Sequence, residues 1–92
     1  MYEFYSDPGH GWLKVPRDDL VELNIEEKIT PYSYMSCGGR VVYLEEDCDL
    51  STYARAKGCN SWSELSDALG GISTINIEDN RVRNLPSYRP NS

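Results

Sequence analysis

Alternating apolar and polar positions near the N-terminus predict an antiparallel pair of strands. Residues 2–5 and 12–15 are short runs rich in aromatic and branched side chains. The link SDPGHG between them contains Pro8 and Gly9. These suit a type II turn, because proline presets φ at about −65° and glycine accepts the positive φ required next. We therefore expect a hairpin with Gly9 at positive φ.

Helical spacing follows and predicts a helix from Pro16 to about Leu23. Proline suits the first turn, where its missing N–H costs nothing, and the acids at 18–19 complement the helix dipole. Asn24 can take the left-handed position that ends the helix, which places Ile25 to fold back on the last turn.

Two β-prone runs flank the link SCGG and predict a second hairpin, which we expect at the centre of the sheet. In the second run, residues 40–45, Val42 and Leu44 share one face. Val41 and Tyr43 share the other, so both faces of this strand can be covered, and we expect Tyr43 in the core.

The second half of the chain carries two helix signals and a last strand. Asp49 is expected to cap a short helix that ends at Gly58, and Ser61 with Glu64 forms an S-x-x-E capping box for another. Residues 72–77 alternate as a strand. The final segment, RVRNLPSYRPNS, is basic and is expected to be extended.

This order of elements predicts one α+β domain over residues 1–92, with a basic extended end from about residue 81. We expect a small, mainly antiparallel sheet with two or three short helices packed on it. No apolar run approaches the ~20 residues of a bilayer span, and the first residues lack the features of a signal peptide. We therefore expect a cytoplasmic protein that does not bind a membrane.

The three cysteines, Cys37, Cys48 and Cys59, lie eleven residues apart and match no CxxC metal or redox pattern. The one histidine, His10, could complete a zinc site with them, but the short paired spacing of such sites is missing. We therefore expect reduced thiols, no disulfide framework, no metal and no cofactor.

Acidic residues are concentrated in the first half of the chain. Residues 1–50 hold eleven acids and four bases, a net charge of −7, whereas residues 51–92 hold four acids and five bases, a net charge of +1. If the acids share a face, they form a negative field that steers binding to a basic surface. The alternative is a solvated face with acids at helix starts. The candidate partner-binding residues are Glu45, Glu46, Asp47 and Asp49, with Asp18, Asp19, Glu22, Glu26 and Glu27 as a second group.

Direct binding of nucleic acid is disfavoured, because phosphate contacts need a basic patch and the C-terminal arginines alone offer one. Asp7 and His10 could form an acid–base pair, but no nucleophile or oxyanion site accompanies them, and a D-P-G turn explains both. The string EEDCD could bind a hard cation but lacks the spacing and glycine of an EF-hand loop. We therefore expect a protein that is not an enzyme. The third hypothesis is a small metal-binding or hydrolytic protein that uses Asp7 and His10.

Four blocks, in order, carry a resemblance: FYSDPGHGWLKVPRDDLVELNI, KITPYSY, VYLEEDCDLSTY and LPSYRP. The chain resembles a family of small proteins of unassigned activity carried by bacteriophages and bacterial mobile elements. Within the blocks, SDPGHGW and YLEEDCDLSTY are the most specific, and Asn24 stands where such relatives are expected to have glycine.

The resemblance implies an origin, and a small acidic protein of this origin is similar in kind to anti-CRISPR proteins. The expected function is therefore a non-enzymatic inhibitor of a CRISPR effector subunit in the cytoplasm of a bacterial host. Its acidic face would bind the effector's basic channel and compete with DNA or guide RNA by charge mimicry. The alternative is an accessory interaction module of a phage without a defence role.

Overall fold

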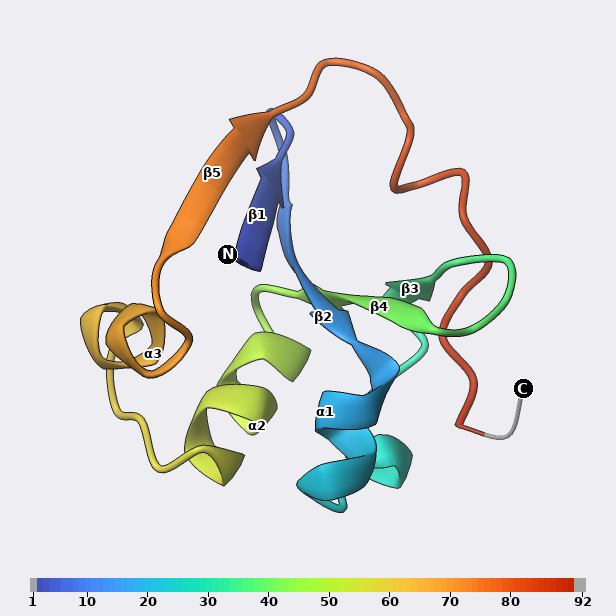
Figure 1. The fold of residues 1–92 in the computed structure, drawn as a ribbon. Coiled ribbons are helices and arrows are strands. Elements are labelled where there is room, and N and C mark those ends of the chain that lie inside the picture. Colours follow the sequence, from blue (N-terminus) through green and yellow to red (C-terminus); the bar gives the residue numbers. More distant parts are fainter. Residues whose placement is uncertain (1, 91–92) are drawn as a thin grey trace.

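Five strands form one open sheet in the computed structural model, which describes residues 2–90 (Figure 1). They are β1 (Tyr2–Ser6), β2 (Gly11–Pro16), β3 (Tyr34–Met35), β4 (Val41–Glu45) and β5 (Ile72–Asn76). The order across the sheet is β3-β4-β2-β1-β5, and all neighbours are antiparallel except β5, which runs parallel to β1. Met1, Asn91 and Ser92, at the ends of the expected domain, lie outside the described residues.

Three helices and one 3₁₀ turn complete the expected α+β class, which the structure confirms. They are α1 (Arg17–Glu22), η1 (Glu26–Lys28), α2 (Asp49–Ala56) and α3 (Trp62–Ala68). Figure 1 shows the helices along one side of the sheet. None of the helices in residues 2–90 has the length and hydrophobicity needed to cross a bilayer.

The main core lies between the sheet and the helices. Leu13 of β2 and Leu44 of β4 are cross-strand partners and are fully buried, because alternate residues of a strand face the same side. The same face carries Val15 and Val42, another buried pair. The helical residues that complete this core are Leu20, Leu50, Tyr53 and Leu65.

The C-terminal segment covers the other face of the sheet. Residues 77–90 run from the end of β5 back to the β3–β4 hairpin (Figure 1), and Ile77 and Val82 are buried there against Trp12. Tyr43 is half-buried beside them, so both faces of β4 are covered, as expected. The segment expected to be extended is therefore folded onto the sheet.

Arg17 ties this segment to the rest of the fold. Its guanidinium donates to the carbonyl oxygens of Arg89 and Pro90, each at 2.7 Å, and to that of Gly39 at 3.2 Å. It also lies over the buried ring of Tyr88, 5.1 Å from the ring centroid. One half-buried cation thus holds the C-terminal segment against the turn of the β3–β4 hairpin.

The first hairpin forms as expected, but the expected geometry of its turn is wrong. Gly9 does not adopt a positive φ. Instead, the Asp7 carboxylate accepts hydrogen bonds from the N–H groups of Gly9 and His10, at 2.9 and 2.8 Å. Position 11 requires glycine for steric reasons, because a Cβ there would lie 2.2 Å from Cζ of Phe4.

The expected helix ends are confirmed after α1, after α2, where Gly58 has φ 78°, and at the start of α3. After α1, Asn24 has φ 56°, and Ile25 folds back and is buried. At α3, the Ser61 hydroxyl accepts from the N–H of Glu64 at 3.1 Å. The Glu64 carboxylate reaches back to the N–H of Asn60 at 2.8 Å.

The second hairpin is not the centre of the sheet, which corrects the expectation. β3 has two residues and lies at the edge, whereas β2 is the central strand. Tyr34 of β3 also forms a bridge with Ser87, so the C-terminal segment covers part of this edge. A short, covered edge strand is a common way to prevent pairing with another chain.

Candidate functional site

Asp49 is buried inside the fold, with 1% of its surface exposed. This corrects the expectation that it caps α2 and the expectation that it lies on an acidic binding surface. The N-cap of α2 is Cys48, and no side chain caps this helix. The Asp49 carboxylate instead accepts from the N–H and hydroxyl of Thr30, the latter at 2.8 Å, and from the hydroxyl of Ser33 at 2.5 Å. It joins the loop before β3 to α2 and is not part of the exposed surface.

Glu45 is also buried, with 8% of its surface exposed. Its two carboxylate oxygens accept from the N–H of Asp47 at 3.1 and 2.7 Å, which closes the turn after β4. No ion pair to this carboxylate is found within residues 2–90. Burying a carboxylate without a cation is unfavourable, because the charged form loses hydration.

Two further candidates are half-buried and already engaged. The Asp19 carboxylate accepts from the hydroxyls of Tyr2 and Tyr53, at 2.6 and 2.8 Å. Burial, and then the hydrogen bond to Asp19, raise the pKa of Tyr53 far above its usual value. Glu26 pairs with Arg17, with Oε2 3.4 Å from Nε. These groups hold α1 and η1 on the fold.

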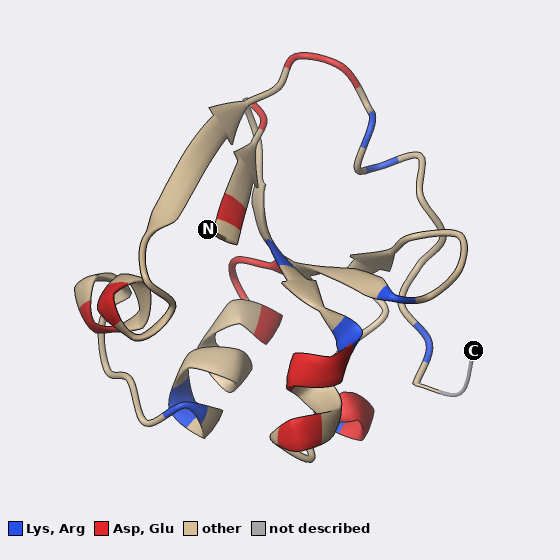
Figure 2. Cartoon of the chain, in the orientation of Figure 1, with Lys and Arg blue, Asp and Glu red and all other residues tan. Residues whose placement is uncertain are grey.

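Five of the nine candidate residues are exposed. Glu46 and Asp47 lie in the loop between β4 and α2, and Asp18, Glu22 and Glu27 lie on α1 and η1. Figure 2 shows the acidic segments of α1 and η1 next to one another at one end of the molecule. We call the three residues Asp18, Glu22 and Glu27 the α1–η1 acidic surface. None of them forms an ion pair with a residue in the described range.

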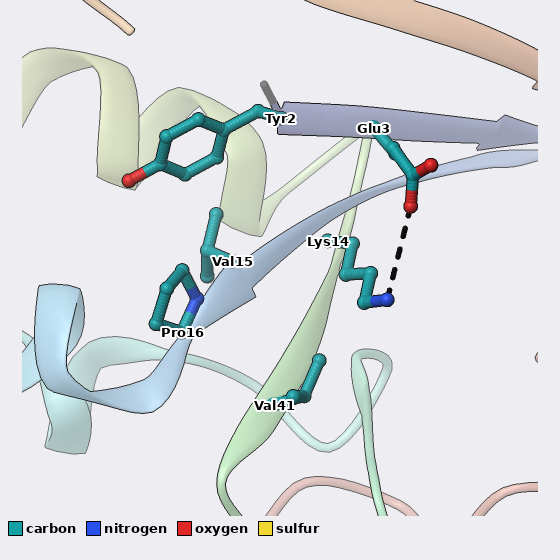
Figure 3. Close-up of a pocket in the computed structure, with 6 residues that line it drawn as sticks. All are labelled: Tyr2, Glu3, Lys14, Val15, Pro16 and Val41. Atoms are coloured by element: carbon teal, nitrogen blue, oxygen red, sulfur yellow. Dashed lines mark ion pairs between the residues drawn. The ribbon is translucent and has the colours of Figure 1, made fainter.

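A shallow, mainly apolar pocket of about 300 Å³ lies where β2 leads into α1 (Figure 3). Tyr2, Val15, Pro16 and Val41 supply its apolar lining. The remaining lining is the Lys14–Glu3 pair, with Nζ 3.7 Å from Oε1. Because Pro16 immediately precedes α1, this apolar hollow is adjacent to the start of the acidic helix.

Asp7 and His10 do not form an acid–base pair. The Asp7 carboxylate binds the guanidinium of Arg83, with Oδ2 2.7 Å from Nε. These hydrogen bonds hold the pKa of Asp7 well below its usual range. Asp7 therefore fixes its own turn and the C-terminal segment, and the hydrolytic arrangement of the third hypothesis is not assembled.

The imidazole of His10 instead lies in a pocket of about 350 Å³ between the first hairpin and the β4–α2 loop. A ring nitrogen of His10 and carboxylate oxygens of Glu45 and Asp47 lie within 4.8 Å of one another. The other lining residues are Trp12, Tyr32, Tyr34, Cys48 and Arg83. The structure thus brings His10 together with acids of the EEDCD string, which lie far from it in the sequence.

Trp12 lines this pocket, and only 2% of its surface is exposed. Its indole Nε1–H is a buried donor without a hydrogen-bond partner in the described part of the chain. An unmet buried donor costs about 1–3 kcal/mol, so its presence in a native fold needs a reason. Trp12 is also directly opposite Glu45 in the β2–β4 register, which puts both side chains on one face of the sheet.

The three cysteines are free: Cys37 and Cys48 are exposed and Cys59 is buried. Loss of hydration, with the carboxylates of Glu45, Asp49 and Asp47, raises the pKa of the Cys48 thiol. A thiol kept protonated is a poor nucleophile, so this pocket does not activate Cys48.

Sequence reasoning missed the contribution of Trp12, Tyr32 and Tyr34 to one pocket. The signal available was the alternation along β2, which places Trp12 on the face opposite Leu13. The partner elements could not be inferred, because they join this face through non-local pairing.

Comparison with protein-family models, with curated proteins and with solved structures gave no match.

Proposed function

We propose that this chain is a counter-defence protein of a phage or mobile element that binds a basic, nucleic-acid-handling surface of a host effector. The partner class is a CRISPR effector subunit, and the site of action is the bacterial cytoplasm. One observation carries the proposal: Asp18, Glu22 and Glu27 are exposed and unpaired within the described chain, on neighbouring segments at one end of the molecule.

This acidic surface has the charge needed to attract a basic channel. Asp18 and Glu22 are four residues apart on α1 and therefore share a helix face, and Glu27 follows on η1. Carboxylates without an ion-pair partner leave their negative charge uncompensated, which raises the rate of encounter with a lysine- and arginine-rich surface. Such a surface normally binds phosphates, so an acidic protein competes with nucleic acid for it.

The apolar pocket beside α1 can supply the buried apolar contact that charge alone does not provide. A standard interface buries about 800 Å² on each partner, a sizeable part of the 5457 Å² surface of this chain. Affinity in such interfaces comes from a few buried side chains near the centre, with charges at the rim. The pocket of Tyr2, Val15 and Pro16 can accept an apolar side chain or the stem of a lysine next to the acids.

The function is tested by phage plating efficiency on a panel of strains, each carrying one active CRISPR or restriction system. Expression of the 92-residue chain is expected to restore plating in at least one CRISPR strain and to leave the restriction strains unaffected. A panel without rescue, followed by co-purification of a metabolic or structural partner, would replace the proposal with the accessory interaction module.

A further inference from the structure

His10, Glu45 and Asp47 come from two segments that the central strands bring together. His10 is two residues before Trp12, and Asp47 is two residues after Glu45. Trp12 and Glu45 are directly opposite each other in the antiparallel β2–β4 pair. The register of these two paired strands therefore sets where the cluster forms.

We propose that His10, Glu45 and Asp47 bind one divalent transition metal ion, with Zn²⁺ as its representative. The inference goes beyond the proposed function and uses no residue of the α1–η1 acidic surface. One imidazole nitrogen and two carboxylate oxygens form a three-ligand set that leaves a coordination position for water, as in open zinc sites. The nitrogen ligand favours zinc-like ions over Mg²⁺ and Ca²⁺, which prefer oxygen ligands.

The three ligand atoms must move somewhat closer together to bind one ion. The three ligand atoms lie within 4.8 Å of one another, and ligands at about 2.0–2.2 Å from a shared zinc ion lie closer together than this. His10 and Asp47 are exposed, so their side chains can rotate inward. Glu45 is buried and held by the N–H of Asp47, so it provides the fixed ligand.

Two independent observations at the same pocket point to a ligand. The buried Glu45 carboxylate has no cation partner in the described chain, and a metal ion would neutralise it. The indole N–H of Trp12, in the wall of the pocket, has no acceptor there either. A ligating carboxylate oxygen can accept from it, since carboxylates that ligate a metal are themselves hydrogen-bonded by surrounding groups.

Zinc titration of the intact, reduced chain tests the site. Isothermal titration calorimetry with Zn²⁺ is expected to show one site. His10→Gln and Asp47→Asn should each weaken the affinity by at least about tenfold, because each removes a ligand. Asp67→Asn is the matched control, because Asp67 is an exposed aspartate on α3 far from the pocket in the sequence, and it should leave the affinity unchanged.

The indole N–H resonance of Trp12 gives a second readout that does not depend on affinity. Zinc should shift this resonance in the wild-type chain, and a Trp62→Phe variant assigns it, since the chain has two tryptophans. The shift should be absent in His10→Gln. Mg²⁺ at the same concentration should leave the resonance in place.

Three outcomes would overturn the site. The first is no zinc binding by the wild-type chain. The second is equal binding by His10→Gln, Asp47→Asn and Asp67→Asn. The third is loss of binding in Cys48→Ser with binding retained in His10→Gln, which would assign the zinc to thiols. Circular dichroism of each variant confirms that the fold is intact before the comparison is made.

Discussion

The carboxylate of Asp49 binds both the backbone N–H and the hydroxyl of Thr30, nineteen residues earlier in the chain. A residue that looks like a helix cap or a surface charge is therefore a buried tie between α2 and the loop that leads into β3. The carboxylates of this protein fall into two groups. Some are buried or paired and hold the fold together, and others, such as Asp18, Glu22 and Glu27, are exposed.

Replacing Asp49 by asparagine is expected to lower the free energy of unfolding by about 2–3 kcal/mol, because hydrogen bonds to a charged acceptor are lost inside the protein. Asp18→Asn, on the exposed surface at the start of α1, should change it by less than about 1 kcal/mol, the size of a helix-dipole contribution. Urea unfolding followed by circular dichroism measures both. Equal stability of the two variants would show that the hydrogen bonds of the buried carboxylate do not stabilise the fold.

Gly11→Ala is expected to destabilise the protein by about 1–3 kcal/mol, as overpacked positions do. A Cβ at Gly11 meets the ring of Phe4 at 2.2 and 2.6 Å, and both residues lie in the paired first hairpin. Gly38→Ala is the control, because a Cβ there meets nothing within 4 Å. The same unfolding measurement should place Gly38→Ala within about 0.5 kcal/mol of wild type, and an equal loss in both would reject the steric argument.

The Asp7–Arg83 pair predicts a loss of stability in acid. Arg83 lowers the pKa of Asp7 in the folded state, whereas the unfolded carboxyl titrates at about pH 4. The stabilisation is therefore complete above that pH and is lost as the pH falls toward the folded-state pKa. The difference in unfolding free energy between wild type and Asp7→Asn should be constant from about pH 6 to 8 and shrink below about pH 4. A difference that stays constant down to about pH 3 would contradict this account.

Local signals predicted most of the fold. The first hairpin, the left-handed Asn24 after α1 and the Ser61–Glu64 box each depend on residues within a few positions of one another, and each is confirmed. The parallel pairing of β5 with β1 joins segments about seventy residues apart, and no local pattern encodes it.

The candidate site was harder to predict, for the same reason. Composition identified the acids but could not separate exposed Glu22 from buried Asp49, because the partners of Asp49 come from a loop before β3. The pocket around His10 likewise depends on the β2–β4 register. Burial and pairing of charges are set by non-local packing, which a single sequence does not display.

The most direct test of the account is charge reversal of the α1–η1 acidic surface in the CRISPR strain where the wild-type chain restores plating. A Glu22→Lys, Glu27→Lys variant should reduce rescue at least tenfold, because about 1.4 kcal/mol of lost attraction already corresponds to that factor. An Asp67→Lys, Glu78→Lys variant carries the same change in net charge on other exposed positions and should rescue like wild type. Equal rescue by both variants would contradict binding through this surface.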